Sequence, residues 1–132
     1  MTVMIEPPNS VVLVVGREEF TPPSTFEGQT CVATGDCIAI SVINVYDAPT
    51  MVTLSTSPDT SHLLKLGEFV LETEGFISVR DVYNQEHQAA GVPPGVTHVT
   101  VWGSHETEPH EVALQIGTQP SSGDDGGIPT TM

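Results

Sequence analysis

The chain has 132 residues, of which 38% are hydrophobic and 15% are charged. This balance predicts one folded domain and excludes a chain that is disordered throughout. Seventeen acidic residues stand against three basic ones, and a formal net charge of −14 disfavours direct binding to nucleic acid or to an anionic membrane. Since no apolar run approaches the roughly eighteen residues that cross a bilayer, and no signal-like start is present, we expect a cytoplasmic protein.

The first third of the chain combines strand patterns with one long loop. Thr2 to Ile5 is a short apolar start, and Ser10 to Gly16 predicts a central strand, because its five consecutive aliphatic residues leave no polar face. Arg17 to Gln29 contains two adjacent prolines and is expected to be a loop. Phe20 and Phe26 would anchor this loop over an open end of the core.

A hairpin is predicted from Cys31 to Val45, since apolar residues alternate along it with a period of two. A three-residue turn over 33–35 would place Gly35 where the backbone is left-handed. In that register Cys31 and Cys37 face each other, so that either a disulfide or two free thiols are compatible with the sequence.

Further strand patterns cover the rest of the chain up to residue 117. The segment Leu63 to Thr73 fits a bent strand interrupted at Gly67, although a helical turn before a strand is the alternative. Asn84 to Ala90 has helix-like chemistry, with a capping residue at its start and alanines and glutamines after it. The other strand patterns are Met51 to Ser55, Phe76 to Val82, Val96 to Gly103 and His110 to Gly117.

These patterns predict an all-β fold, a two-sheet antiparallel β-sandwich of about seven or eight strands with at most one short helix. The sandwich domain would cover residues 1–117. Residues 118–132 are rich in glycine, serine and aspartate and are expected to form a flexible C-terminal tail.

Metal-ligand residue types are densest near the end of the sandwich domain. His98, His105 and His110 lie close in sequence to Glu106 and Glu108. Three or four such side chains meeting at one point would form a zinc or transition-metal site, and a metal-dependent enzyme is therefore one alternative. The spacing matches no known zinc motif, so the histidines are weak candidates and no cofactor is predicted.

Catalytic motifs are missing from the sequence. It contains no Gly-x-Ser-x-Gly elbow, no phosphate-binding glycine loop and no His-Glu-x-x-His pair. Cys31 and Cys37 have no basic neighbour in the hairpin that would lower a thiol pKa. The sequence therefore predicts a protein that binds rather than an enzyme.

Trp102 is the candidate anchor for such binding. By alternation it lies opposite Val99 and Val101, so it either packs in a second apolar layer or is exposed near acidic loops. An exposed tryptophan close to Glu106 and Glu108 would suit recognition of a basic protein, because tryptophan anchors interfaces and its ring attracts cations.

One resemblance to a known family is present in the second half of the chain. The run Glu74-Gly75-Phe76-Ile77-Ser78-Val79, then Val92-Pro93-Pro94-Gly95, then Val99-Thr100-Val101 resembles the closing part of DNA-entry nuclease inhibitors of the competence-protein-J type. The resemblance implies a small acidic sandwich-like protein that inhibits a basic nuclease without being an enzyme. It covers about thirty residues.

The sequence thus predicts an acidic, non-enzymatic binding protein whose partner is a basic protein, such as a nuclease. Electrostatic attraction to a cationic partner is the physical reason, since the net charge of −14 would speed association at low salt. The alternative is a structural subunit of a larger assembly, and a homo-oligomer is compatible with both interpretations.

Overall fold

The computed structural model describes residues 2–117, which form ten strands and one three-residue 3₁₀ helix. The predicted tail, 118–132, lies outside the described residues. The elements are β1 (Thr2–Ile5), η1 (Pro8–Ser10), β2 (Val11–Val15), β3 (Cys31–Ala33), β4 (Cys37–Ser41), β5 (Thr50–Ser55), β6 (Leu64–Thr73), β7 (Phe76–Arg80), β8 (Glu86–Gly91), β9 (Gly95–Gly103) and β10 (Glu111–Ile116). No helix among these elements is long and apolar enough to cross a membrane.

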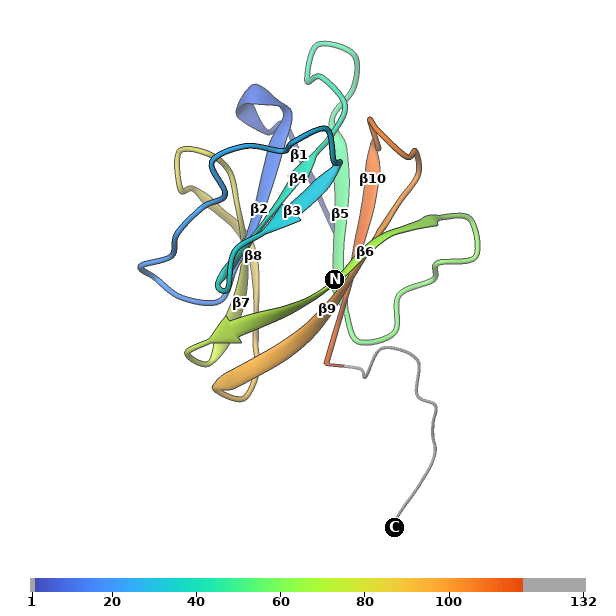
Figure 1. The fold of residues 1–132 in the computed structure, drawn as a ribbon. Coiled ribbons are helices and arrows are strands. Elements are labelled where there is room, and N and C mark those ends of the chain that lie inside the picture. Colours follow the sequence, from blue (N-terminus) through green and yellow to red (C-terminus); the bar gives the residue numbers. More distant parts are fainter. Residues whose placement is uncertain (1, 118–132) are drawn as a thin grey trace.

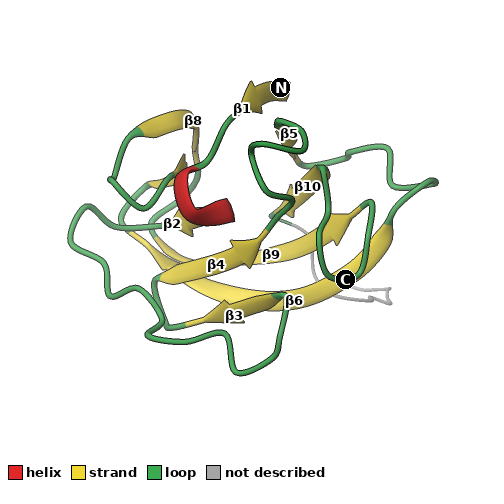
Figure 2. Cartoon of the chain, turned by 90° about the horizontal axis from the view of Figure 1, so that it is seen from above, coloured by secondary structure: helices red, strands yellow, loops and turns green. Residues whose placement is uncertain are grey.

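The strands form two five-stranded sheets that pack face to face (Figure 1). Sheet A has the order β1-β5-β10-β9-β6, and sheet B has the order β3-β4-β2-β7-β8. The predicted all-β sandwich is confirmed. It differs from the prediction in having ten strands and in one parallel pair, because β10 returns between β5 and β9 and runs parallel to β5. The 3₁₀ helix η1 lies at the connection between β1 and β2 (Figure 2).

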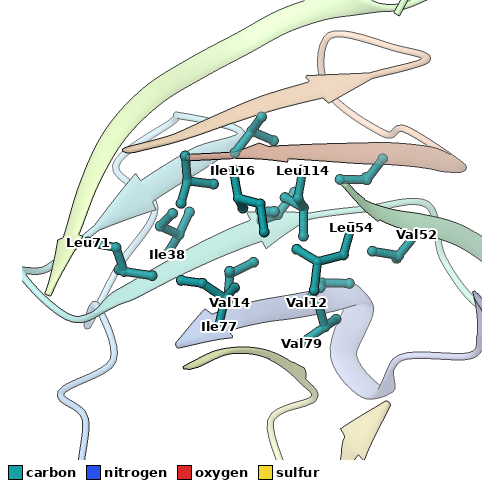
Figure 3. Packing of buried hydrophobic residues seen from close by; sticks show 14 of the residues in the cluster. Val12, Val14, Ile38, Val52, Leu54, Leu71, Ile77, Val79, Leu114 and Ile116 are labelled. Atoms are coloured by element: carbon teal, nitrogen blue, oxygen red, sulfur yellow. The ribbon is translucent and has the colours of Figure 1, made fainter. Parts of the chain in front are cut away.

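The main core lies between the two sheets (Figure 3). Val12 and Val14 of β2 point into it and are fully buried, as the run of valines predicts for a central strand. Val112, Leu114 and Ile116 of β10 pack against it from sheet A, which confirms the expected inward face of the last strand. Burial of such aliphatic side chains, at about 25 cal/mol per Å² of apolar surface, is the main stabilising contribution to the fold.

A second apolar cluster covers the outer face of sheet B. Leu13 and Val15 point away from the main core, and the long loop between β2 and β3 folds over them. Phe20 and Phe26 of this loop pack on the cluster. The two phenylalanines therefore anchor the loop, as predicted, but on the outer face of a sheet rather than over an open end of the core.

Strand β6 is bent at a bulge. Its pairing with β9 shifts between Lys65 and Gly67, which confirms the predicted strand interrupted at Gly67 and excludes the helical alternative. A bulge inserts an extra residue on one strand and increases the local twist. The bend lets the ten-residue β6 follow the long β9 along the whole edge of sheet A.

The predicted helix from Asn84 to Ala90 is wrong. Residues Glu86–Gly91 form β8, which pairs with β7 at the edge of sheet B. Helix propensities of alanine, glutamine and glutamate are worth only tenths of a kcal/mol per residue, so tertiary pairing overrides them. Gln88 shows the reason directly, since its side chain is buried and its amide donates to the carbonyl of Val52 in the opposite sheet at 3.3 Å.

The predicted register of the β3–β4 hairpin is also wrong. The amide of Thr34 donates to the carbonyl of Cys37 at 2.8 Å, and Cys31 pairs with Ile40 rather than with Cys37. This shift by an odd number of residues moves the two cysteines to opposite faces of sheet B. Cys31 packs against the main core and Cys37 lies in the outer cluster. Both are free thiols, so the possible disulfide is excluded.

The two sheets are joined by backbone hydrogen bonds at the end opposite to η1. The amide of Glu72 in β6 donates to the carbonyl of Gly35 at 2.8 Å, and the amide of Glu74 donates to the carbonyl of Gly16 at 2.9 Å. A Cβ atom at Gly16 would collide with the backbone carbonyl of Glu72. Glycine is therefore needed at position 16 for this close approach.

Candidate functional site

Three loops lie at the end of the sandwich where β4, β7 and β9 finish, and we call them together the loop end. They are 42–49 between β4 and β5, 81–85 between β7 and β8, and 104–110 between β9 and β10. β4 and β7 both pair antiparallel with β2 and therefore end on the same side. The three loops extend along the upper side of the molecule in Figure 1.

Loop 104–110 carries the predicted binding residues Glu106 and Glu108, and both are exposed. Its shape is held by side-chain to backbone hydrogen bonds. The imidazole Nδ1 of His105 accepts from the amides of Thr107 and Glu108, each at 3.1 Å. The hydroxyl oxygen of Ser104 accepts from the amide of His110 at 3.1 Å. The carboxylates therefore project from an ordered loop.

The same loop is attached to both sheets. The hydroxyl of Thr30 donates to the carbonyl of Glu106, and the amide of Ile43 donates to the carbonyl of Pro109 at 3.0 Å. Pro109 is itself buried. Loop 42–49 consequently lies beside loop 104–110, and the two form one continuous surface.

Loop 42–49 adds an aromatic side chain and a further carboxylate to this surface. Tyr46 is 95% exposed, and Asp47 beside it is exposed as well. The side-chain oxygen of Asn44 accepts from the amide of Tyr46 at 2.9 Å, a local turn that fixes the backbone before the tyrosine. The tyrosine side chain itself is held almost entirely in solvent.

The exposed carboxylates of loops 42–49 and 104–110 have no ion-pair partner among the described residues. All three basic residues of the chain pair with other carboxylates, Arg17 with Glu72, Lys65 with Glu68, and Arg80, beside loop 81–85, with Glu18 and Glu86. Within residues 2–117, no basic side chain lies within ion-pair distance of Asp47, Glu106 or Glu108. Their negative charges are therefore available to an external cation.

The three candidate metal histidines are not brought together. His98 lies near the start of β9, whereas His105 and His110 follow its far end, about 17 Å or more away at 3.4 Å per strand residue. The Nδ1 atoms of His105 and His110 already contact loop groups, the latter at 3.2 Å from the hydroxyl of Ser104. Among the described residues, no three His, Cys, Asp or Glu side chains are grouped so that they could hold a metal ion.

Trp102 lies on the outer face of sheet A, half-buried, and belongs to neither apolar cluster. Its indole N–H donates to the side-chain oxygen of Gln115 at 3.1 Å, and its strand neighbours are Lys65 and Ala113. Trp102 therefore does not pack in a second apolar layer, and it is only partly exposed. The structure places Trp102 on the sheet face rather than on the loop end, and its role in binding stays a prediction.

Arg80 was not among the predicted site residues, although its side chain makes three hydrogen bonds on the outer face of sheet B. Arg80 is 5% exposed. Its guanidinium donates to Ser78 at 2.9 Å, to Asn84 at 3.0 Å and to Glu18 at 2.7 Å, and it lies 6.0 Å from the ring of Phe76. The signal was the alternation in β7, which places Phe76, Ser78 and Arg80 on one face.

A shallow groove of about 400 Å³ lies elsewhere, between the loop 16–30 and the edge strand β3. Its lining residues are Pro23, Ser24, Thr25, Glu27, Gln29, Val32, Ala33 and Thr34. These side chains include one carboxylate but no imidazole, thiol or amine that could act with it as an acid–base pair. The groove does not form a recognisable catalytic site.

Comparison with known proteins finds a similar solved structure but no similar sequence. No protein-family model matches the chain, and no curated protein is similar to it in sequence. The fold is similar to the crystal structure of ComJ from Bacillus subtilis, described as an inhibitor of the DNA degrading activity of NucA, with a TM-score of 0.63 at 13% identity over 88% of this chain and 92% of that chain. The resemblance expected from the sequence is therefore confirmed at the level of the fold.

Proposed function

We propose that this protein is a non-enzymatic inhibitor that binds a nuclease of the NucA type through its loop end. The observation that carries the proposal is the surface formed by Asp47, Glu106 and Glu108, whose charges no basic residue among 2–117 neutralises. The similarity of the fold to ComJ, an inhibitor of NucA, supports the choice of partner.

The charge provides a mechanism for inhibition. An enzyme that degrades DNA binds the phosphate backbone with lysine and arginine side chains, and that cationic surface attracts carboxylates in the same way. A protein with a net charge of −14 would approach such a surface under electrostatic steering. Bound there, it would exclude DNA from the enzyme and inhibit by competition.

The test is a DNA-degradation assay with purified NucA and increasing amounts of the full-length protein. We expect inhibition that weakens as DNA concentration rises, because DNA and inhibitor compete. We also expect the inhibition constant to increase between 50 and 300 mM salt, because salt screens the attraction between the carboxylates and the cationic surface of the enzyme. A wild-type protein that leaves DNA degradation unchanged at low salt contradicts the proposal.

The location of the site is tested with two charge-matched variants. Asp47→Asn/Glu106→Gln/Glu108→Gln removes three charges from the loop end. Three surface ion pairs of about 0.5 kcal/mol each correspond to roughly tenfold weaker inhibition. The control is Asp36→Asn/Glu72→Gln/Glu74→Gln, which changes the net charge equally at the opposite end. Equal losses in both variants would show that net charge alone matters and that the loop end is not the site.

A further inference from the structure

The third loop of the loop end, 81–85, is a turn whose backbone is fixed by one buried carboxylate. Asp81 is 3% exposed, and its Oδ1 accepts from the amide of Tyr83 at 2.8 Å and from that of Gln85 at 3.1 Å. Its Oδ2 contacts the imidazole Nε2 of His87 at 3.1 Å. One side chain therefore connects both halves of the turn to strand β8.

The rest of the turn is fixed by Arg80. The guanidinium Nη1 donates to the side-chain oxygen of Asn84 at 3.0 Å. Asn84 has a φ of 66°, in the left-handed region that asparagine adopts more readily than most residues. The amide of Asn84 donates to the carbonyl of Asp81 at 2.9 Å. The hairpin tip thus has little conformational freedom left to lose on binding.

This rigid tip presents its apolar side chains to solvent. Tyr83 is 76% exposed and Val82 is 36% exposed. Side chains of this kind are normally buried where they can be, while a tyrosine on a pre-ordered backbone is a common interface anchor, because little entropy is lost when it binds. Two carboxylates lie at the base of the hairpin, Glu18 and Glu86, whose side chains are 66% and 52% exposed. Both pair with the single guanidinium of Arg80, so one negative charge is left in excess.

We infer that the β7–β8 hairpin is a pre-organised anchor that inserts Tyr83 into the cationic surface of the partner. This inference rests on the proposed function and names the residue that contributes most to it. The phenol ring offers its face to an arginine or lysine of the partner, and the two carboxylates Glu18 and Glu86 outnumber the one guanidinium of Arg80 beside the contact. Asp81 acts as a positioning residue, because its hydrogen bonds fix the backbone of the turn that carries Tyr83.

The experiment measures inhibition of NucA by three variants of the full-length protein. We expect Tyr83→Ala to weaken inhibition at least tenfold and Tyr83→Phe to retain most of it, since the ring is kept. Asp81→Ala keeps Tyr83 but releases the turn, so we expect weaker inhibition together with faster amide exchange confined to residues 82–85. Tyr46→Ala, which removes the other exposed tyrosine of the loop end, is the matched control and should cost less than Tyr83→Ala.

The outcomes separate this inference from the function it rests on. If the wild-type protein does not inhibit NucA, the proposed function and the Tyr83 anchor are both refuted. If the wild type inhibits and Tyr83→Ala inhibits equally well, or Tyr46→Ala costs more, the anchor is wrong while the inhibitor function stands. If Asp81→Ala shows faster exchange in the turn but unchanged inhibition, pre-organisation is overturned.

Discussion

Arg80 and Glu18 form an ion pair at 2.7 Å although 62 positions separate them in the sequence. The pair connects the end of β7 to the start of the long loop after β2. Because the Arg80 side chain is 6% exposed and that of Glu18 is 66% exposed, the contact is buried on one side and hydrated on the other. It holds the loop that carries Phe20 and Phe26 against sheet B.

Replacing Arg80 by methionine is therefore expected to lower the free energy of unfolding by about 2 kcal/mol, the range for buried hydrogen bonds to a charged group. Glu18 can return to water, so the larger penalty of a stranded buried charge does not apply. Urea unfolding measures the change. Arg17→Met is the control, since its 3.8 Å pair with Glu72 is half-exposed and should contribute less than about 1 kcal/mol. Equal losses would refute the special role of Arg80.

Gly16→Ala is expected to destabilise the fold by about 2 kcal/mol, in the range for overpacking. The added methyl group would collide with the backbone carbonyl of Glu72 and disturb the hydrogen bonds that join the sheets there. Gly91→Ala has open space around the new Cβ and should be nearly neutral. Thermal unfolding of the two variants checks the difference, and a neutral Gly16→Ala would show that the sheets can separate locally at no cost.

The two thiols predict a loss of stability at alkaline pH. Burial raises the pKa of Cys31 to about 12, and burial together with the charge of Asp36 raises the pKa of Cys37 to about 12. The ordinary value is 9.0. Above pH 9 the unfolded chain loses these protons while the folded chain retains them, so stability decreases as pH rises from 9 toward 12, by up to about 1.4 kcal/mol per pH unit for each thiol.

Chemical denaturation at pH 8 and pH 10.5 measures this slope. The Cys31→Ala/Cys37→Ala variant should show a shallower decrease than the wild type over the same interval, since tyrosine and lysine ionise in both. The folded wild-type protein should also react slowly with a thiol reagent at pH 8, and both cysteines should react once the chain is unfolded. Parallel slopes in the two proteins would contradict the raised pKa values.

The lowered pKa of Asp81 predicts a loss of stability at acidic pH. Burial alone would raise the pKa of this carboxyl, but hydrogen bonds from His87 and from the amides of Gln85 and Tyr83, with the charge of His87, lower it below 3.8. The stabilisation is present above pH 4 and is lost as pH falls through the folded-state value. The difference in stability between wild type and Asp81→Asn should therefore be fully present above pH 4 and should shrink as the pH falls below 4. A constant difference would show that Asp81 contributes by packing alone.

Periodicity was sufficient to predict most of the fold. Alternation in Val96 to Gly103 and the all-apolar run Val11 to Val15 identified β9 and β2 because burial of one or both faces imposes those patterns. Loop chemistry marked the segment 17–29 for the same physical reason, since adjacent prolines cannot continue a strand. These features depend on local sequence.

What could not be predicted depends on partners distant in sequence. Asn84 to Ala90 reads as a helix because its residues favour one, and only pairing with β7 makes Glu86–Gly91 a strand. The register of the β3–β4 hairpin depends on packing on both faces of sheet B rather than on its turn. No sequence pattern marked Tyr83 as an anchor, because its exposure depends on the β7–β8 turn, where a helix was expected instead. Glu106 and Glu108 were proposed from their charge and their closeness in sequence to Trp102, and their role stays a prediction.

The parallel pairing of β10 with β5 has a consequence for synthesis on the ribosome. Sheet A cannot close until residues 111–116 enter between β9, which directly precedes them, and β5, which is synthesised much earlier, so β5 has to wait with one edge unpaired. Late insertion of a central strand is typical of slowly folding β proteins, which fold in about milliseconds to seconds. Carboxylates spread along the waiting chain repel neighbouring copies and would keep it from aggregating in that interval.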